Sequence, residues 1–109
     1  MIRVSKSCLS SLEKKYLNKV IQKQYLGMGP EVKKFESELQ KFFGRKVICV
    51  NSGTAALHLA LAAKNYGRGD KFIAPTYTFV ASVEVGEYLG MEPILVDCDS
   101  DFNIDIEKI

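Results

Sequence analysis

The 109-residue sequence predicts an α/β fold built on a parallel sheet, and two observations carry this prediction. Short apolar runs at 47–50, 72–75 and 94–97 are separated by helical segments at 54–66 and 79–89. This β-α-β-α-β order favours parallel strands joined by right-handed crossovers. The segment 54–66 is also apolar on nearly every side, so we expect it to be covered on several faces, as in a larger domain.

Two amphipathic helices are expected before the first strand. Ser10 and Glu13 have the spacing of a capping box at the start of a helix over 10–26, which Gly27 would end. A second helix is expected from Pro30, a residue type favoured in the first helical turn, up to Gly44. Both segments carry an apolar stripe at helical spacing.

We expect residues 1–45 to form an N-terminal helical segment and residues 46–109 to form the first β-α-β-α-β part of a larger domain. Three strands leave at least one sheet edge and part of both faces uncovered. Residues 105–109 have the pattern of a helix in its first turn. The sequence therefore predicts an incomplete domain.

Composition excludes several classes of function. The net charge is +2 and basic residues are interspersed with acidic ones, which does not favour nucleic-acid binding. No apolar run reaches the roughly 18 residues of a membrane span, and the first residues lack the apolar core of a signal peptide. We expect a cytoplasmic protein that binds neither nucleic acid nor membrane.

No metal site is predicted. The three cysteines (Cys8, Cys49 and Cys98) are far apart and have no C-x-x-C pair, which favours reduced thiols. His58 lies in the apolar helix without a second ligand at metal-site spacing, so we expect it to pack rather than bind metal. The acidic run 97–101 begins like a calcium loop, but Phe102 stands where that loop requires glycine.

The turn after the first expected strand is the strongest candidate site. Asn51, Ser52, Gly53 and Thr54 lead directly into a helix, whose first N–H groups and positive dipole end suit a phosphate or carboxylate. The sequence has neither the glycine pattern of a dinucleotide-binding turn nor a Walker loop. Taken alone, the turn is equally compatible with anion binding and with simple helix capping.

The order of motifs resembles a known family. It is carried by Gly29–Glu36 (GPEVKKFE), Asn51–Leu61 (NSGTAALHLAL), Gly69-Asp70, Pro75–Ser82 (PTYTFVAS) and Pro93–Asp99 (PILVDCD). Together they resemble the pyridoxal-phosphate-dependent nucleotide-sugar aminotransferases of the DegT/DnrJ/EryC1/StrS type. The resemblance implies the amino-terminal part of the large domain of a fold-type-I aminotransferase.

The resemblance also implies roles for individual residues. The cofactor phosphate would lie on Gly53, Thr54 and Ala55, and the ring of Phe79 would stack on the cofactor pyridine. A core position for Phe79 is the alternative. Tyr77 is a candidate for the same cleft. For Asp97 and Asp99, which end a strand in the family pattern, we favour a structural capping role.

The resemblance implies that no catalytic residue lies in this chain. The family depends on a lysine that bonds to the cofactor aldehyde and on an acidic residue beside the pyridine nitrogen, and both are expected downstream. We therefore expect the 109 residues alone to be inactive.

For the full-length protein, the resemblance implies amino transfer from glutamate to a nucleotide-linked keto-sugar, in polysaccharide or glycan biosynthesis, by a homodimer. A sugar dehydratase on the same scaffold, with histidine in place of the lysine, and an inactive truncated product are the alternatives.

Overall fold

The computed structural model describes residues 4–109, and residues 1–3 of the expected N-terminal segment lie outside the described part. The chain divides into two compact units, Met1–Cys49 and Val50–Ile109. The boundary expected between residues 45 and 46 stays a prediction. No helix within residues 4–109 is both long enough and apolar enough to cross a membrane.

The first helix of the first unit, α1 (Ser11–Gln22), begins as the sequence predicts. The Ser10 hydroxyl oxygen accepts a hydrogen bond from the Leu12 N–H at 3.1 Å, and the Glu13 carboxylate accepts the Ser10 N–H at 2.6 Å. The predicted capping box is confirmed. The helix ends before the expected residue 26, because Gln24 adopts a left-handed conformation with φ of 54°.

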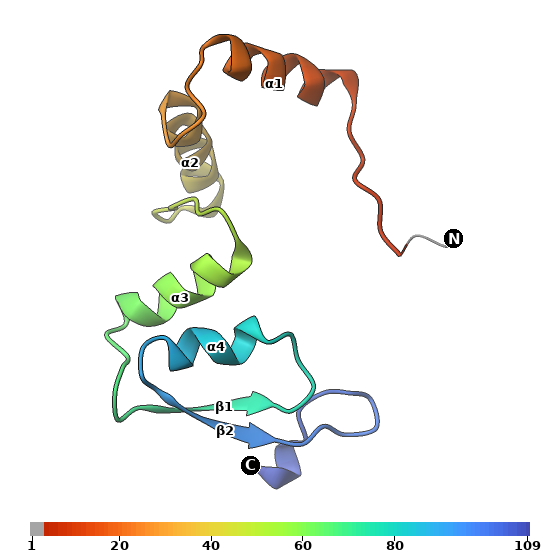
Figure 1. Cartoon of the computed structure of the whole chain (residues 1–109), viewed down its shortest axis with the longest axis vertical. Coiled ribbons are helices and arrows are strands. Elements are labelled where there is room, and N and C mark those ends of the chain that lie inside the picture. Colours follow the sequence, from red (N-terminus) through yellow and green to blue (C-terminus); the bar gives the residue numbers. More distant parts are fainter. Residues whose placement is uncertain (1–3) are drawn as a thin grey trace. The chain divides into compact units, whose positions relative to one another are not determined.

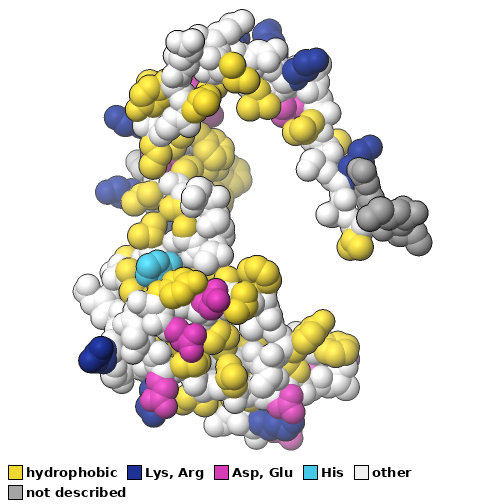
Figure 2. All heavy atoms as spheres, in the orientation of Figure 1, with side chains coloured by type: hydrophobic (Ala, Val, Ile, Leu, Met, Phe, Trp, Pro, Cys, Tyr) yellow, Lys and Arg dark blue, Asp and Glu magenta, His cyan; other side chains and the backbone are white. Residues whose placement is uncertain are grey.

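The second helix, α2 (Pro30–Phe43), confirms the prediction at both ends. Pro30 occupies its first turn, and Gly44 closes it in a left-handed conformation with φ of 64° that favours glycine. Figure 2 shows hydrophobic side chains exposed along these helices, and neither α1 nor α2 contains a buried residue.

The strand predicted at 47–50 is wrong for this structure. Residues 46–50 have no regular secondary structure, and the Cys49 N–H donates instead to the Glu36 carboxylate at 2.8 Å. A strand requires a hydrogen-bonded neighbour. Within residues 4–109 the only sheet has two strands, and neither pairs with this segment.

The second unit has the predicted α/β character. Its elements are α3 (Gly53–Ala63), β1 (Lys71–Pro75), α4 (Ala81–Glu87), β2 (Glu92–Val96) and a short 3₁₀ turn, η1 (Ile106–Lys108). β1 and β2 pair in parallel, with Lys71 opposite Glu92 and Pro75 opposite Val96. The predicted parallel sheet is confirmed with two strands rather than three.

The second unit also holds the buried apolar core found in residues 4–109. It consists of Ala74, Ala81, Val85, Met91 and Val96, each no more than 6% exposed. α4 packs on both strands, and α3 packs on α4 (Figure 1). Within residues 4–109, α4 is the element that packs on α3, and Leu57 and Leu59 remain about half exposed (47% and 51%). The apolar sequence of α3 predicts that other segments pack on its remaining sides. Residues 4–109 do not supply these segments.

Candidate functional site

The start of α3 is fixed by Ser52. Its backbone is extended, its hydroxyl oxygen accepts the Ala55 N–H at 3.1 Å, and its carbonyl accepts the Ala56 N–H at 3.1 Å. This N-cap satisfies one of the free donors at a helix start. The Ala55 amide, which the family resemblance assigns to a phosphate, is therefore engaged within the chain.

The amides of Gly53 and Thr54 are in a different position. Neither N–H group donates a hydrogen bond to an acceptor within residues 4–109. They occupy the first turn of an eleven-residue helix, where the macrodipole adds partial positive charge. This arrangement can bind an anion through two main-chain donors.

Three of the four predicted site residues, Gly53, Thr54 and Phe79, line one hollow. Its volume is about 540 Å³, and it is lined by Gly53, Thr54, Ala56, Leu57, Phe79, Ala81 and Ser82. The start of α3 contributes two free amides, and Phe79 contributes an aromatic ring that is 74% exposed. Ala55, the fourth predicted residue, does not line the hollow. An exposed aromatic ring beside free amides can hold a flat ligand that carries a negative charge.

Phe79 is held by the turn that leads into α4. The Ser82 N–H donates to the Phe79 carbonyl at 2.9 Å, and Ala81, between them in the chain, is only 4% exposed. The side chain of Phe79 is free while its backbone is anchored. The Phe79 side chain is 74% exposed in this structure, and its role stays a prediction.

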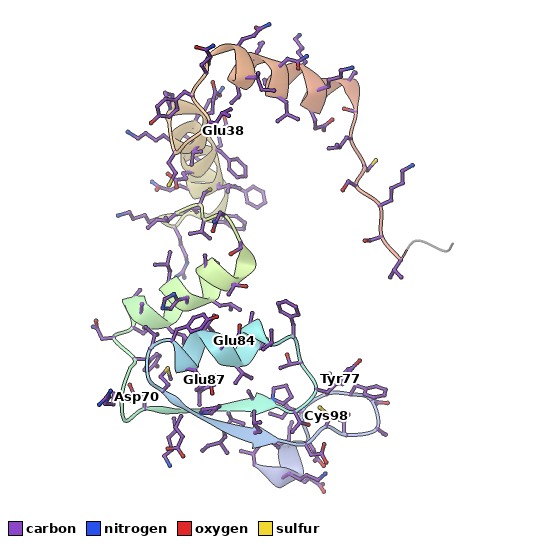
Figure 3. The ribbon with its side chains drawn as sticks, in the orientation of Figure 1. Glu38, Asp70, Tyr77, Glu84, Glu87 and Cys98 are labelled. Carbon is purple, nitrogen blue, oxygen red and sulfur yellow. The ribbon has the colours of Figure 1, made fainter. Side chains whose placement is uncertain are left out.

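Tyr77 does not line the hollow. Its ring lies 5.4 Å from the ring of Phe102, beside the loop that follows β2 (Figure 3). The cleft position considered for Tyr77 is therefore not observed in this structure.

Asp97 and Asp99 make the hydrogen bonds of structural caps. The Asp97 carboxylate accepts the Cys98 N–H at 2.9 Å and the Thr76 hydroxyl at 3.3 Å. The Cys98 N–H, and then the nearby Lys108 ammonium, lower the pKa of Asp97 below its ordinary value. One Asp99 oxygen accepts the N–H groups of residues 101 and 103. These bonds agree with the capping role favoured from the sequence.

His58 packs against an aromatic ring. Its ring lies edge-on to Tyr88 of the α4 end, with centroids 5.8 Å apart, and His58 is half-buried. Within the described part of the chain, no group of three or more histidine, cysteine, aspartate or glutamate residues could hold a metal ion.

Sequence reasoning left capping open at the turn before α3, and the Ser52 hydroxyl does cap the Ala55 amide. It missed one residue of this site, Ser82, which lines the hollow three positions after Phe79. The place of Ser82 depends on the fold, because the packing of α4 on α3 brings it to the start of α3.

Comparison with known proteins shows the family. Residues 7–109 match the DegT/DnrJ/EryC1/StrS aminotransferase family, in agreement with the resemblance of its motifs. The chain belongs to this family. The match covers the N-terminal portion of the family members, so the fold class predicted from the resemblance is confirmed as well.

Curated DegT/DnrJ/EryC1/StrS relatives are clearly similar but much longer. GDP-perosamine synthase of Escherichia coli O157:H7 is 36% identical over 92% of this chain and 28% of its own length. Spore coat polysaccharide biosynthesis protein SpsC of Bacillus subtilis is 38% identical over 85% of this chain and 24% of its own length. The chain thus spans about a quarter to three tenths of the relatives that it matches.

Solved structures of the family superpose well on this chain. The PMP-form of the sugar aminotransferase Spr1654 of Streptococcus pneumoniae gives a TM-score of 0.85 at 31% identity, over 98% of this chain and 28% of that one. E. coli GDP-4-keto-6-deoxy-D-mannose-3-dehydratase with bound hydrated PLP gives 0.81 at 29% identity, over 95% and 29%. Pyridoxal phosphate, the cofactor implied by the resemblance, is confirmed for the family.

Proposed function

We propose that this chain is the N-terminal part of a pyridoxal-phosphate-dependent sugar aminotransferase. Residues 1–45 would form its N-terminal helical segment, and residues 46–109 would form the first part of the cofactor-binding large domain. One observation carries the proposal: the free amides of Gly53 and Thr54 and the ring of Phe79 border the same hollow in a chain of this family.

The residues present fit the cofactor. Its phosphate is a dianion, which suits two main-chain donors at the positive end of α3. Its pyridine ring is flat, and the exposed ring of Phe79 offers a stacking surface beside those donors. Ala55 would contribute to the seat only indirectly, because its amide already holds the Ser52 hydroxyl in place.

These contacts assign separate roles to the cofactor and to the residues around it. When bound, pyridoxal phosphate supplies an aldehyde on an electron-withdrawing ring that stabilises negative charge developing beside it. Gly53 and Thr54 bind the phosphate and fix the position of the ring. Phe79 orients the ring face and excludes water from that side. No residue of this chain is proposed to be catalytic, so the 109 residues alone would bind cofactor without transferring an amino group.

The substrates proposed for the full-length protein are glutamate, as amino donor, and a nucleotide-linked keto-sugar. Support comes from the relatives, which include GDP-perosamine synthases and a polysaccharide biosynthesis protein. We further propose a cytoplasmic homodimer working in surface polysaccharide or glycan biosynthesis.

A second candidate is a sugar dehydratase on the same scaffold. It is favoured by the similarity to the E. coli 3-dehydratase, which matches this chain almost as well as the aminotransferase Spr1654 does. The residue at the family's lysine position separates the two, because lysine supports transfer and histidine supports elimination. An inactive truncated product remains the third candidate.

The cofactor proposal is tested by titrating the 109-residue chain with pyridoxal phosphate and, in parallel, with pyridoxal. We expect NMR shifts at the Gly53 and Thr54 amides with pyridoxal phosphate, much weaker ones with pyridoxal, and ring shifts at Phe79 with both. Shifts scattered over the surface, or equal amide shifts with the two compounds, would refute a phosphate seat at α3.

A further inference from the structure

Ser82 is a polar group in the hollow to which the family resemblance assigns no role. It lies in the first turn of α4 and lines the same hollow as Gly53, Thr54 and Phe79. Its neighbours Ala56, Leu57 and Ala81 bring no polar side chain to the lining. Among the lining side chains, hydroxyl groups come only from Ser82 and Thr54.

The hydroxyl of Ser82 is oriented by a partner. The Thr78 hydroxyl donates a hydrogen bond to the Ser82 hydroxyl oxygen at 3.1 Å. A hydroxyl group has one hydrogen to donate and two lone pairs to accept with. Because Ser82 uses a lone pair for Thr78, its own hydrogen stays free for a second acceptor.

The position of Ser82 is tied to that of the aromatic ring. Its N–H donates to the Phe79 carbonyl at 2.9 Å, and the adjoining Ala81 is buried at 4% exposure. The hydroxyl and the ring therefore belong to one anchored turn, and a ligand stacked on Phe79 lies within the space that Ser82 lines.

We propose that Ser82 is a hydrogen-bond donor to the pyridoxal phosphate bound in this hollow, and that Thr78 is the positioning residue that orients its hydroxyl. The inference rests on the proposed function. The acceptor is an oxygen of the cofactor, on either the phosphate or the pyridine ring. In both cases Ser82 adds a side-chain contact to the main-chain donors of α3.

The test is cofactor binding by the 109-residue chain and its variants, measured by equilibrium dialysis and NMR. Ser82→Ala should weaken pyridoxal phosphate binding about threefold to tenfold, the usual range for one lost hydrogen bond. Ser82→Thr keeps the hydroxyl and should restore most of the affinity. Thr78→Val should have a smaller effect than Ser82→Ala. Ser100→Ala, in an exposed loop of the same unit, serves as the matched control and should bind as the unaltered chain does.

Parallel titrations with inorganic phosphate and with pyridoxal identify the acceptor. A loss on Ser82→Ala in the phosphate titration assigns the hydrogen bond to the phosphate, and a loss in the pyridoxal titration assigns it to the ring. Equal binding by Ser82→Ala and the unaltered chain in all three titrations would overturn the role of Ser82 while leaving the proposed function standing. A failure of the unaltered chain to bind pyridoxal phosphate would instead overturn the proposed function, and the role of Ser82 with it.

Discussion

The two units of this chain are built on different principles. In Val50–Ile109, five apolar residues are buried between α4 and the two strands. In the described part of Met1–Cys49, both helices are free of buried residues, and side chains such as Leu12, Tyr16 and Phe42 are more than half exposed. Local capping defines the helices of the first unit, whereas packing defines the second.

The difference explains where the candidate site lies. A binding site needs groups from several segments held at fixed separations. The second unit supplies this, because the burial of Ala81 and Val85 anchors the turn that carries Phe79 and Ser82. The described part of the first unit has hydrogen bonds at its helix ends, but none of its large apolar side chains is buried in a core that would fix one helix against the other.

The contrast between the two units should be clearest when a charged residue is introduced into each of them. Val85→Asp places an unpaired carboxylate at a position that is 3% exposed, which should cost about 4 kcal/mol and abolish the hydrogen-exchange protection of β1 and β2. Leu12→Asp, at a position 55% exposed in the first turn of α1, should change stability by less than about 0.5 kcal/mol. Similar losses from both substitutions would contradict the contrast between the units.

Removing the N-cap serine of one helix in each unit should have an effect of intermediate size. Ser10→Ala and Ser52→Ala each remove a cap worth about 1 kcal/mol. α1 has no buried face to compensate, so its carbon-13 shifts should move toward coil values. α3 should stay helical because it packs on α4. Melting of α3 in Ser52→Ala would show that packing on α4 does not hold it.

Acid should produce the smallest effect, and in the first unit Glu13 should show it. Hydrogen bonds from the Ser10 side chain and from main-chain N–H groups lower the pKa of Glu13 below its ordinary value of 4.5. A lowered pKa means that the ionised carboxylate stabilises α1 fully above that value and loses this effect as the pH falls through the lowered one.

The Glu13 effect is measured by following the α1 shifts during acid titration. Glu13→Gln keeps the capping box but cannot ionise in this range, so its α1 shifts should not change with pH. An identical acid transition in Glu13→Gln would exclude Glu13 as the responsible group.

Local chemistry in the sequence predicted some elements of the fold well. The capping box at Ser10 and the limits of α2 at Pro30 and Gly44 are features of neighbouring residues, and all three are confirmed. Features that depend on distant partners were harder to predict. The segment 47–50 has strand-like residues but no strand to pair with, and the helix predicted to 66 stops at Ala63 before the left-handed Asn65.

The same limit applies to the candidate site. The family motifs predicted a cofactor-binding role for Gly53, Thr54 and Phe79. The structure places all three around one hollow. The Ser52 cap on the Ala55 amide is local and agrees with the capping alternative left open by the sequence. The presence of Ser82 was not anticipated, because it depends on the packing of α4 on α3.

The central claim, that the free amides at the start of α3 hold the cofactor phosphate, is tested most directly by replacing Gly53. Proline is tolerated at the first helical position and follows an extended Ser52 without strain, so Gly53→Pro removes one N–H donor and leaves α3 intact. Gly53→Ala keeps the donor, and its added carbon meets nothing within 4 Å.

Equilibrium dialysis with pyridoxal phosphate should show about 10- to 100-fold weaker binding for Gly53→Pro than for Gly53→Ala, the range for one hydrogen bond to a charged group. Pyridoxal, which lacks the phosphate, should bind the two variants equally. Equal affinity of the two variants for pyridoxal phosphate would contradict the claim.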